Sequence, residues 1–242
     1  MTLDFRSLPA IAAGLLMIAT PVLADQKNSA IFDVSIRGIS AATLSLSGAV
    51  EGKSYAATGV LKSSGILGFL KKIRYDASVA GRTTDGRYTP SRYTEKADTG
   101  KRKSEAVMAY KSGVPQVKSY NPPRPQRVEE IAPSSQGGTV DPLTALFAVV
   151  RDVPAAEACN LKLVLFDGRR RSQVVLGAPA AKGDTITCAG EYRRLKGFSA
   201  DDMAEKSRFP FQLTYEDAGN GMVHVTEISM DTLYGKGRMI RR

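Results

Sequence analysis

Few side chains in this sequence could carry out a reaction. His224 is the only histidine, and it lies in an alternating segment on the face opposite Val223 and Val225. A Ser–His–Asp hydrolase would need this histidine and a G-x-S-x-G nucleophile turn, and the sequence contains no such turn. We therefore interpret His224 as a structural or simply exposed residue.

Carboxylates and glycine-rich loops give no better candidate. The adjacent pairs Glu129–Glu130 and Asp201–Asp202 lie in polar segments that are typical of solvated surface. Several His or Cys ligands cannot be assembled into a metal site, and no phosphate loop or dinucleotide fingerprint is present. The sequence thus predicts a protein that is not an enzyme, with no catalytic residue, metal ligand or cofactor.

The two cysteines, Cys159 and Cys188, lie in segments that read as strands. In an oxidising compartment a pair without a leftover thiol predicts one disulfide, which would close a loop of about 30 residues. On the chain-entropy model such a bridge stabilises the fold by roughly 3–4 kcal/mol. A metal pair or a redox pair is the alternative, but neither a C-x-x-C spacing nor a histidine cluster supports it.

Arginines form the remaining candidate site. Asp167-Gly168-Arg169-Arg170-Arg171 reads as a hairpin turn that runs into a strand, and residues 193–196 end the strand that holds Cys188. Arginine forks suit phosphates and carboxylates, whereas charged strand ends are also common as solvated faces. The net charge of +10 favours anionic partners. Nucleic acid is not expected, because tryptophan is absent and aromatic residues make up only 7% of the chain.

The N-terminus predicts where the protein works. Residues 8–20 are almost continuously apolar, and Val22-Leu23-Ala24 offers a signal-peptidase site, so residues 1–24 read as a secretory signal peptide. The alternative is a membrane anchor, but a helix needs about 20 apolar residues to span a bilayer. No later segment is long and apolar enough, so the protein is expected not to span a membrane after cleavage.

Short alternating segments dominate residues 25–242, for example residues 31–36, 43–47, 55–62 and 223–230. Alternation with a period of two predicts strands with one buried and one solvated face. About ten to twelve such strands, separated by glycine-containing turns, predict a mainly β fold: a single curled antiparallel sheet, barrel or half-barrel, in one domain.

Two segments break the β pattern. Residues 65–72 suggest a helical turn, and residues 141–151 form the clearest helix, with Asp141 as N-cap and Pro142 in the first turn. Leu143, Leu146 and Phe147 share one apolar stripe of this helix with Val150. A long polar loop, residues 121–139, precedes it.

One helix of this length covers only part of a sheet with ten or more strands. The remaining concave face either holds a hydrophobic ligand or is filled by side chains, and the sequence leaves both possibilities open. If a ligand binds, Leu143, Leu146 and Phe147 would contact its apolar part, and Arg169 and Arg170 its anionic part.

Several fragments in order carry a family resemblance: residues 141–146, Asp167-Gly168-Arg169-Arg170, residues 188–193, Pro210-Phe211 and residues 232–235. Together they resemble a family of secreted proteobacterial proteins of unknown function that is regarded as similar in fold to the lipoprotein carriers LolA and LolB. The resemblance implies a Gram-negative periplasm, about eleven strands and helices in the concavity. It implies no catalytic residue, and fold alone does not fix function.

Two hypotheses follow for the function. The first is a periplasmic protein that binds an acyl chain, an anionic lipid or a lipidated partner during maintenance of the cell envelope. The second is a structural or protein-interaction role in the envelope, with a filled barrel and no small ligand. A hydrolase is a distant third.

Overall fold

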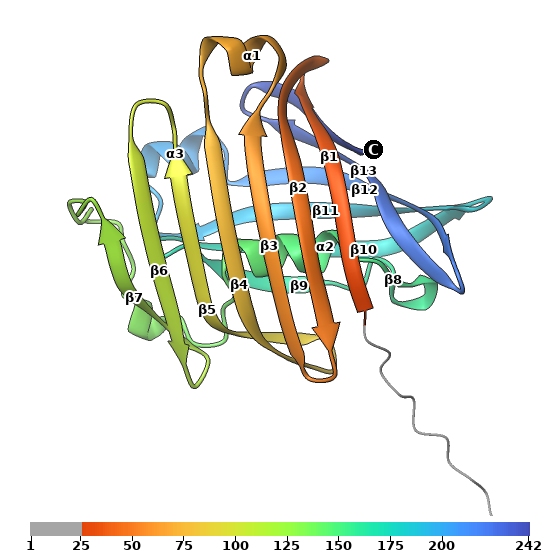
Figure 1. Cartoon of the computed structure of the whole chain (residues 1–242), viewed down its shortest axis with the longest axis horizontal. Coiled ribbons are helices and arrows are strands. Elements are labelled where there is room, and N and C mark those ends of the chain that lie inside the picture. The colour runs from red at the N-terminus through yellow and green to blue at the C-terminus, as the bar shows by residue number, and fades with distance from the viewer. Residues whose placement is uncertain (1–25) are drawn as a thin grey trace, which may run out of the picture.

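The computed structural model describes residues 26–242, so the predicted signal peptide lies outside the described residues. A single antiparallel sheet of fourteen strands dominates the fold (Figure 1). Its strands are β1 (Gln26–Ile36), β2 (Ile39–Glu51), β3 (Ser54–Ser63), β4 (Arg74–Thr84), β5 (Arg87–Asp98), β6 (Lys103–Lys111), β7 (Val114–Asn121), β8 (Val153–Pro154), β9 (Lys162–Phe166), β10 (Arg171–Lys182), β11 (Thr185–Lys196), β12 (Arg208–Gly219), β13 (Met222–Thr232) and β14 (Gly235–Arg241).

The strand count corrects the expectation of about eleven. The two-residue strand β8 pairs with β13 and is too short to leave a periodic signal. The last strand, β14, pairs with both β13 and β1 and so joins the last described strand to the first.

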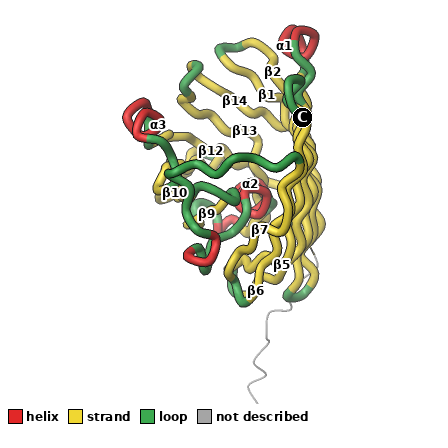
Figure 2. Tube along the Cα trace, turned by 90° about the vertical axis from the view of Figure 1, so that its left-hand side faces the viewer, coloured by secondary structure: helices red, strands yellow, loops and turns green. Residues whose placement is uncertain are grey.

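The sheet curls but does not close. Its strand order is β7-β6-β5-β4-β3-β2-β1-β14-β13-β12-β11-β10-β9, so β7 and β9 are its two edges. Figure 2 shows the result: β1–β7 form one wall, β9–β12 the other, and α2 lies between them. The predicted mainly β, single-sheet architecture is confirmed, in the half-barrel form rather than the closed one.

Three short α-helices accompany the sheet: α1 (Gly65–Leu70), α2 (Pro142–Val150) and α3 (Ala200–Glu205). The predictions for α1 and α2 are confirmed, while α3 was treated as a polar loop. Ser199 begins α3 with a capping box, in which its side chain accepts a hydrogen bond from the backbone N–H of Asp202, 3.1 Å away. No helix within residues 26–242 has the length and apolar content needed to cross a bilayer.

The helix α2 is buried on nearly all sides rather than along one stripe. Of its nine residues, seven are buried, and Leu146 and Pro142 are half-buried. Its N-cap Asp141 accepts a hydrogen bond from the backbone N–H of Thr144 at 2.9 Å, as the capping pattern predicts. The helix is apolar all round because it fills the space between two walls.

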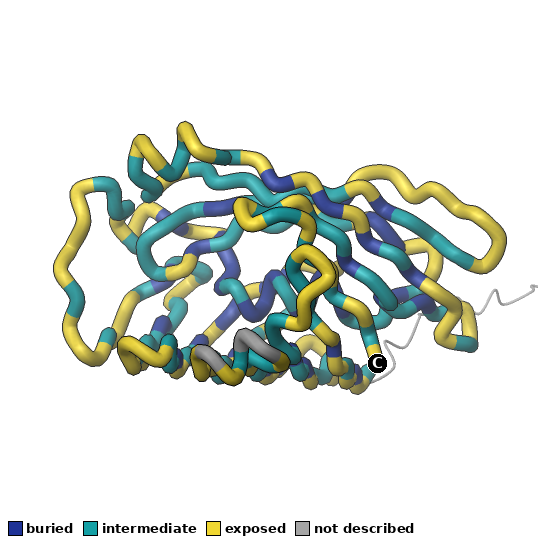
Figure 3. The backbone as a smooth tube through the Cα atoms, turned by 90° about the horizontal axis from the view of Figure 1, so that it is seen from above, coloured by how far each residue is buried: buried dark blue, intermediate teal, exposed yellow. Residues whose placement is uncertain are grey.

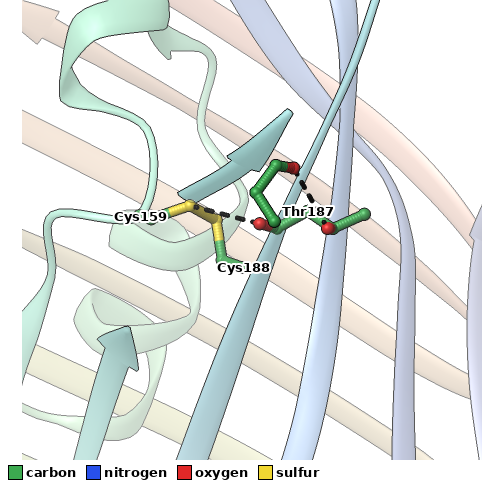
Figure 4. Close-up of a disulfide and its surroundings, with 4 residues drawn as sticks. Cys159, Thr187 and Cys188 are labelled. Atoms are coloured by element: carbon green, nitrogen blue, oxygen red, sulfur yellow. Dashed lines mark hydrogen bonds between the residues drawn. A yellow bond between two sulfur atoms is a disulfide. The ribbon is translucent and has the colours of Figure 1, made fainter. Parts of the chain in front are cut away.

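The predicted disulfide joins Cys159 to Cys188, with Cα atoms 5.4 Å apart (Figure 4). Cys188 lies in β11 as expected, but Cys159 is in the loop before β9, with a φ of 65°. The prediction of a strand at Cys159 is therefore wrong. Apolar residues before Lys162 made the predicted strand begin three residues before the true start of β9.

Candidate functional site

The inner face of the sheet is continuous from wall to wall. Cross-strand pairing aligns Val34 of β1 with Met239 of β14, Met239 with Ile228 of β13, and Ile228 with Leu213 of β12. Paired residues of an antiparallel sheet project to the same side. A single apolar row therefore crosses the junction between β1 and β14 and faces the concavity.

The helix α2 covers the half of the inner face nearest the β2–β3 and β4–β5 turns. A side chain at Gly48 would collide with Phe147, and one at Gly59 with Leu143, so these glycines let the helix approach the sheet. The ring of Phe147 also stacks on Tyr55, with centroids 6.4 Å apart. This half of the concavity is a filled core.

Polar groups under α2 are satisfied within the core. The hydroxyl of Thr144 donates to Asp141 Oδ2 at 2.6 Å, and it lies 2.8 Å from the hydroxyl of Tyr55, which therefore donates to it. Burial raises the pKa of the Asp141 carboxyl, although the hydrogen bonds from Thr144 oppose that shift. The two hydrogen bonds that link Tyr55, Thr144 and Asp141 anchor the helix and are shielded from solvent.

The half nearest α1 is not covered by the helix. Here apolar side chains of the inner face pack against the core but stay half-buried, and we call this surface the uncovered inner face. Its members are Val34, Leu61, Ala77, Met230 and Met239. Figure 3 shows the buried segments between the two walls and the exposed turns around them.

The apolar residues proposed from the sequence have different environments. Phe147 is fully buried and Leu143 is 4% exposed, both against β2 and β3, so they belong to the core. Leu146 is the one large side chain of α2 that remains half-buried. Of the three, Leu146 alone keeps part of its side-chain surface accessible.

The two proposed arginines have separate partners. Arg169 Nε lies 2.5 Å from Glu130 Oε1, and Arg169 Nη2 donates to the carbonyl of Pro125 at 2.8 Å. Arg170 lies over the ring of Phe198, 5.0 Å from its centroid, and one third of its side chain is exposed. Asp167 shapes their hairpin turn by accepting both backbone N–H groups.

Arg170 belongs to a rim of stacked cations that sequence reasoning did not identify as a unit. Arg194 lies 5.4 Å from the centroid of Phe198 and 5.2 Å from that of Phe209, and Lys206 lies 5.0 Å from the latter. The pairing of β10 with β11 brings these groups together, since Ser172 faces Arg194 in the register.

A shallow depression of about 370 Å³ lies on the outer face of the sheet. It is lined by three consecutive residues from each of β1, β2 and β3 and by none from α2, which places it on the side away from the helix. Apart from Lys27, the outward side chains there are small, for instance Ser29, Ser47 and Ala49. This surface is open.

The catalytic candidates stay isolated. His224 is half-buried on β13, between the buried Val223 and Val225, as the alternation predicted. Within residues 26–242 no group of three or more His, Cys, Asp or Glu side chains could hold a metal ion.

The sequence held only a partial signal for the uncovered inner face. Val34, Leu61 and Met230 all occupy apolar positions of alternating strands, so their burial on one side was predictable. Which of them the helix would leave uncovered depends on where α2 crosses the sheet, and periodicity does not contain that information.

Comparisons with known proteins identify relatives of unknown function. The profile of a family described as protein of unknown function (DUF3108) matches residues 31–225. A solved structure from Brucella abortus, a β-barrel-like protein of the domain of unknown function DUF1849, is 16% identical. The superposition covers 88% of this chain and 94% of the Brucella abortus chain, with a TM-score of 0.48. No curated protein matches the sequence. The expected likeness to LolA and LolB stays a prediction.

Proposed function

The chain belongs to the DUF3108 family, whose function is unknown, and we propose that it is a non-enzymatic protein that binds an acyl chain or a similarly apolar group. The observation that carries the proposal is the uncovered inner face. Half-buried apolar side chains from β1, β3, β4, β13 and β14 line one concave side of the sheet.

Burial of apolar area would drive such binding. Each methylene removed from water contributes about 0.8 kcal/mol, so an acyl chain of about ten carbons could gain roughly 8 kcal/mol before the cost of ordering it. Met230 and Met239 suit this role because unbranched thioethers adapt to ligands of different shape. The neighbouring rim of Arg170, Arg194 and Lys206 would favour an anionic head on the ligand.

We further propose that the protein acts in the periplasm, as a part of cell-envelope maintenance. The disulfide supports an oxidising compartment, and the sequence pattern of residues 1–24 supports export. A lipidated protein or an anionic lipid of the envelope would then be the partner.

A second candidate is a structural or protein-interaction role without a small ligand. It is favoured by the filled half of the concavity, where α2 and the rings of Tyr55, Tyr88 and Phe147 pack together. It is also favoured by the small-residue depression on the outer face, which offers a flat surface to another protein.

The test uses two adjacent residues of β14 that face opposite sides. Met239 is half-buried on the inner face, whereas Ile240 is 42% exposed on the outer face. Protein exported by its own leader in a Gram-negative host would be examined by native mass spectrometry for bound lipid. Fatty-acid affinity would then be measured for the purified wild type, Met239→Gln and Ile240→Gln.

We expect a co-purifying lipid, and an affinity about tenfold weaker for Met239→Gln but unchanged for Ile240→Gln. A wild-type protein that carries no lipid and binds no fatty acid would refute the proposal. Equal effects of the two substitutions would refute the location. The second candidate would gain support if the unliganded protein cross-linked to one envelope protein through the outer face.

A further inference from the structure

The two edges of the open sheet come together at a seam near the end of β7. A side chain added at Gly168, in the β9–β10 turn, would lie 3.6 Å from Val117 of β7 and 3.7 Å from Met108 of β6. The loop that follows β7 lies against the same turn, because the N–H of Ile131 donates to the carbonyl of Arg169 at 3.2 Å. Hydrogen bonds between strands do not close this seam.

Arginines gather at the seam around one aromatic ring. The guanidinium of Arg124 lies 3.9 Å from the ring centroid of Tyr120, and that of Arg102 lies 5.3 Å from it. Arg102 also donates a hydrogen bond to the Tyr120 hydroxyl. Arg169 reaches the same region, and an added Cβ at Gly168 would be 3.8 Å from Arg124 Nη2. We call Arg102, Arg124, Arg127 and Arg169 the seam cluster.

Carboxylates do not balance this cluster. Glu130 pairs with Arg169, and the side chain of Asp167 is used by backbone N–H groups of its own turn. Within residues 26–242 no carboxylate forms an ion pair with Arg102, Arg124 or Arg127. Of these four guanidinium groups, only that of Arg169 has a carboxylate partner.

The excess of positive charge in the seam cluster shifts the pKa values of two groups there, Arg169 and Tyr120. The pKa of Arg169 is lowered, first by its burial and then by the positive charges of Arg124 and Arg127. Burial would raise the pKa of Tyr120, but a hydrogen bond with Ser104 and the charges of Arg124 and Arg102 outweigh it, so the pKa is lowered. An anion between these groups would relieve the repulsion.

We propose that the seam cluster is a binding site for a phosphate group, held chiefly by the forks of Arg102 and Arg124 where the sheet edges meet. Planar guanidinium groups bind phosphate oxygens in pairs, and their stacking on Tyr120 orders the forks before the ligand arrives. A phosphate has enough oxygens to engage several arginines, whereas a carboxylate has two. The site involves none of the residues of the uncovered inner face.

Calorimetric titration of the mature protein with inorganic phosphate tests this site without any lipid. We expect Arg124→Gln and Arg102→Gln each to weaken phosphate binding about tenfold or more. Arg87→Gln, at the exposed start of β5 beside the β4–β5 turn, removes the same charge and should leave the affinity unchanged. Acetate at equal ionic strength should bind more weakly than phosphate.

Tyrosine titration gives a second measurement that a merely structural cluster would not change. Because the chain has no tryptophan, the tyrosinate absorbance of Tyr120 can be isolated as the difference between wild type and Tyr120→Phe. Bound phosphate should raise the pKa of Tyr120 by neutralising Arg102 and Arg124.

Equal phosphate affinities for Arg124→Gln and Arg87→Gln would overturn the proposal, and so would a Tyr120 titration that phosphate leaves unchanged. A short-chain phosphatidic acid then separates the two sources of phosphate. Affinity that exceeds that of inorganic phosphate and falls in Arg124→Gln identifies a lipid headgroup. Equal affinity identifies a free phosphate group. Failure of fatty-acid binding alone would leave this site standing.

Discussion

Removal of the disulfide should destabilise the protein by about 3–4 kcal/mol. Cys159 and Cys188 are separated by 29 residues, and the loop-entropy relation gives this magnitude for a cross-link of that span. Both side chains are buried, so replacement by alanine avoids leaving a buried hydroxyl or thiol without a partner. For a domain of this size, the loss corresponds to a fall in Tm of about 6–16 °C.

The assay is urea and thermal unfolding of the double variant Cys159→Ala/Cys188→Ala, followed by far-ultraviolet circular dichroism. The denaturant slope should also rise, because the unfolded chain without a cross-link exposes more surface. Wild type treated with a reductant should behave like the variant, and the same reductant should not affect the variant. A double variant as stable as oxidised wild type would refute the reasoning.

Three further predictions concern packed positions of the fold. Asp141→Asn should gain stability relative to wild type as pH rises above about 3.8. Burial raises the folded-state pKa of Asp141 above this ordinary value. The stabilisation that wild type draws from this carboxyl is therefore present at lower pH and is lost as pH rises through the raised pKa. A urea-midpoint difference between the two proteins that does not vary with pH would contradict this. Tyr55→Phe should cost about 1 kcal/mol in chemical denaturation, since it removes the hydroxyl that donates to Thr144. Gly190→Ala should cost about 1–3 kcal/mol, because the new methyl would lie 2.3 Å from the ring of Phe211, and Phe211→Leu in the same chain should restore part of the loss.

Local sequence signals determined much of the fold. Alternation at residues 31–36, 55–62 and 223–230 fixed which side chains face inward, because the period of a strand depends only on its backbone. Asp141 and Pro142 located the start of α2, since capping is a contact between residues three apart. The capping box at Ser199 is an equally local signal, but the polar residues around it favoured a solvated segment over a helix.

The position of α2 on the sheet came only from the tertiary structure. Gly48 and Gly59 receive Phe147 and Leu143 from a segment about ninety residues away, and no periodicity encodes such a contact. That placement makes two of the three proposed apolar contacts part of the core, and it leaves Met230 and Met239 half-buried. The seam cluster likewise joins Arg102, Arg124 and Arg169 from three separate segments. The sequence determines the type of each side chain, whereas the curvature of the sheet determines which charges from distant segments become neighbours.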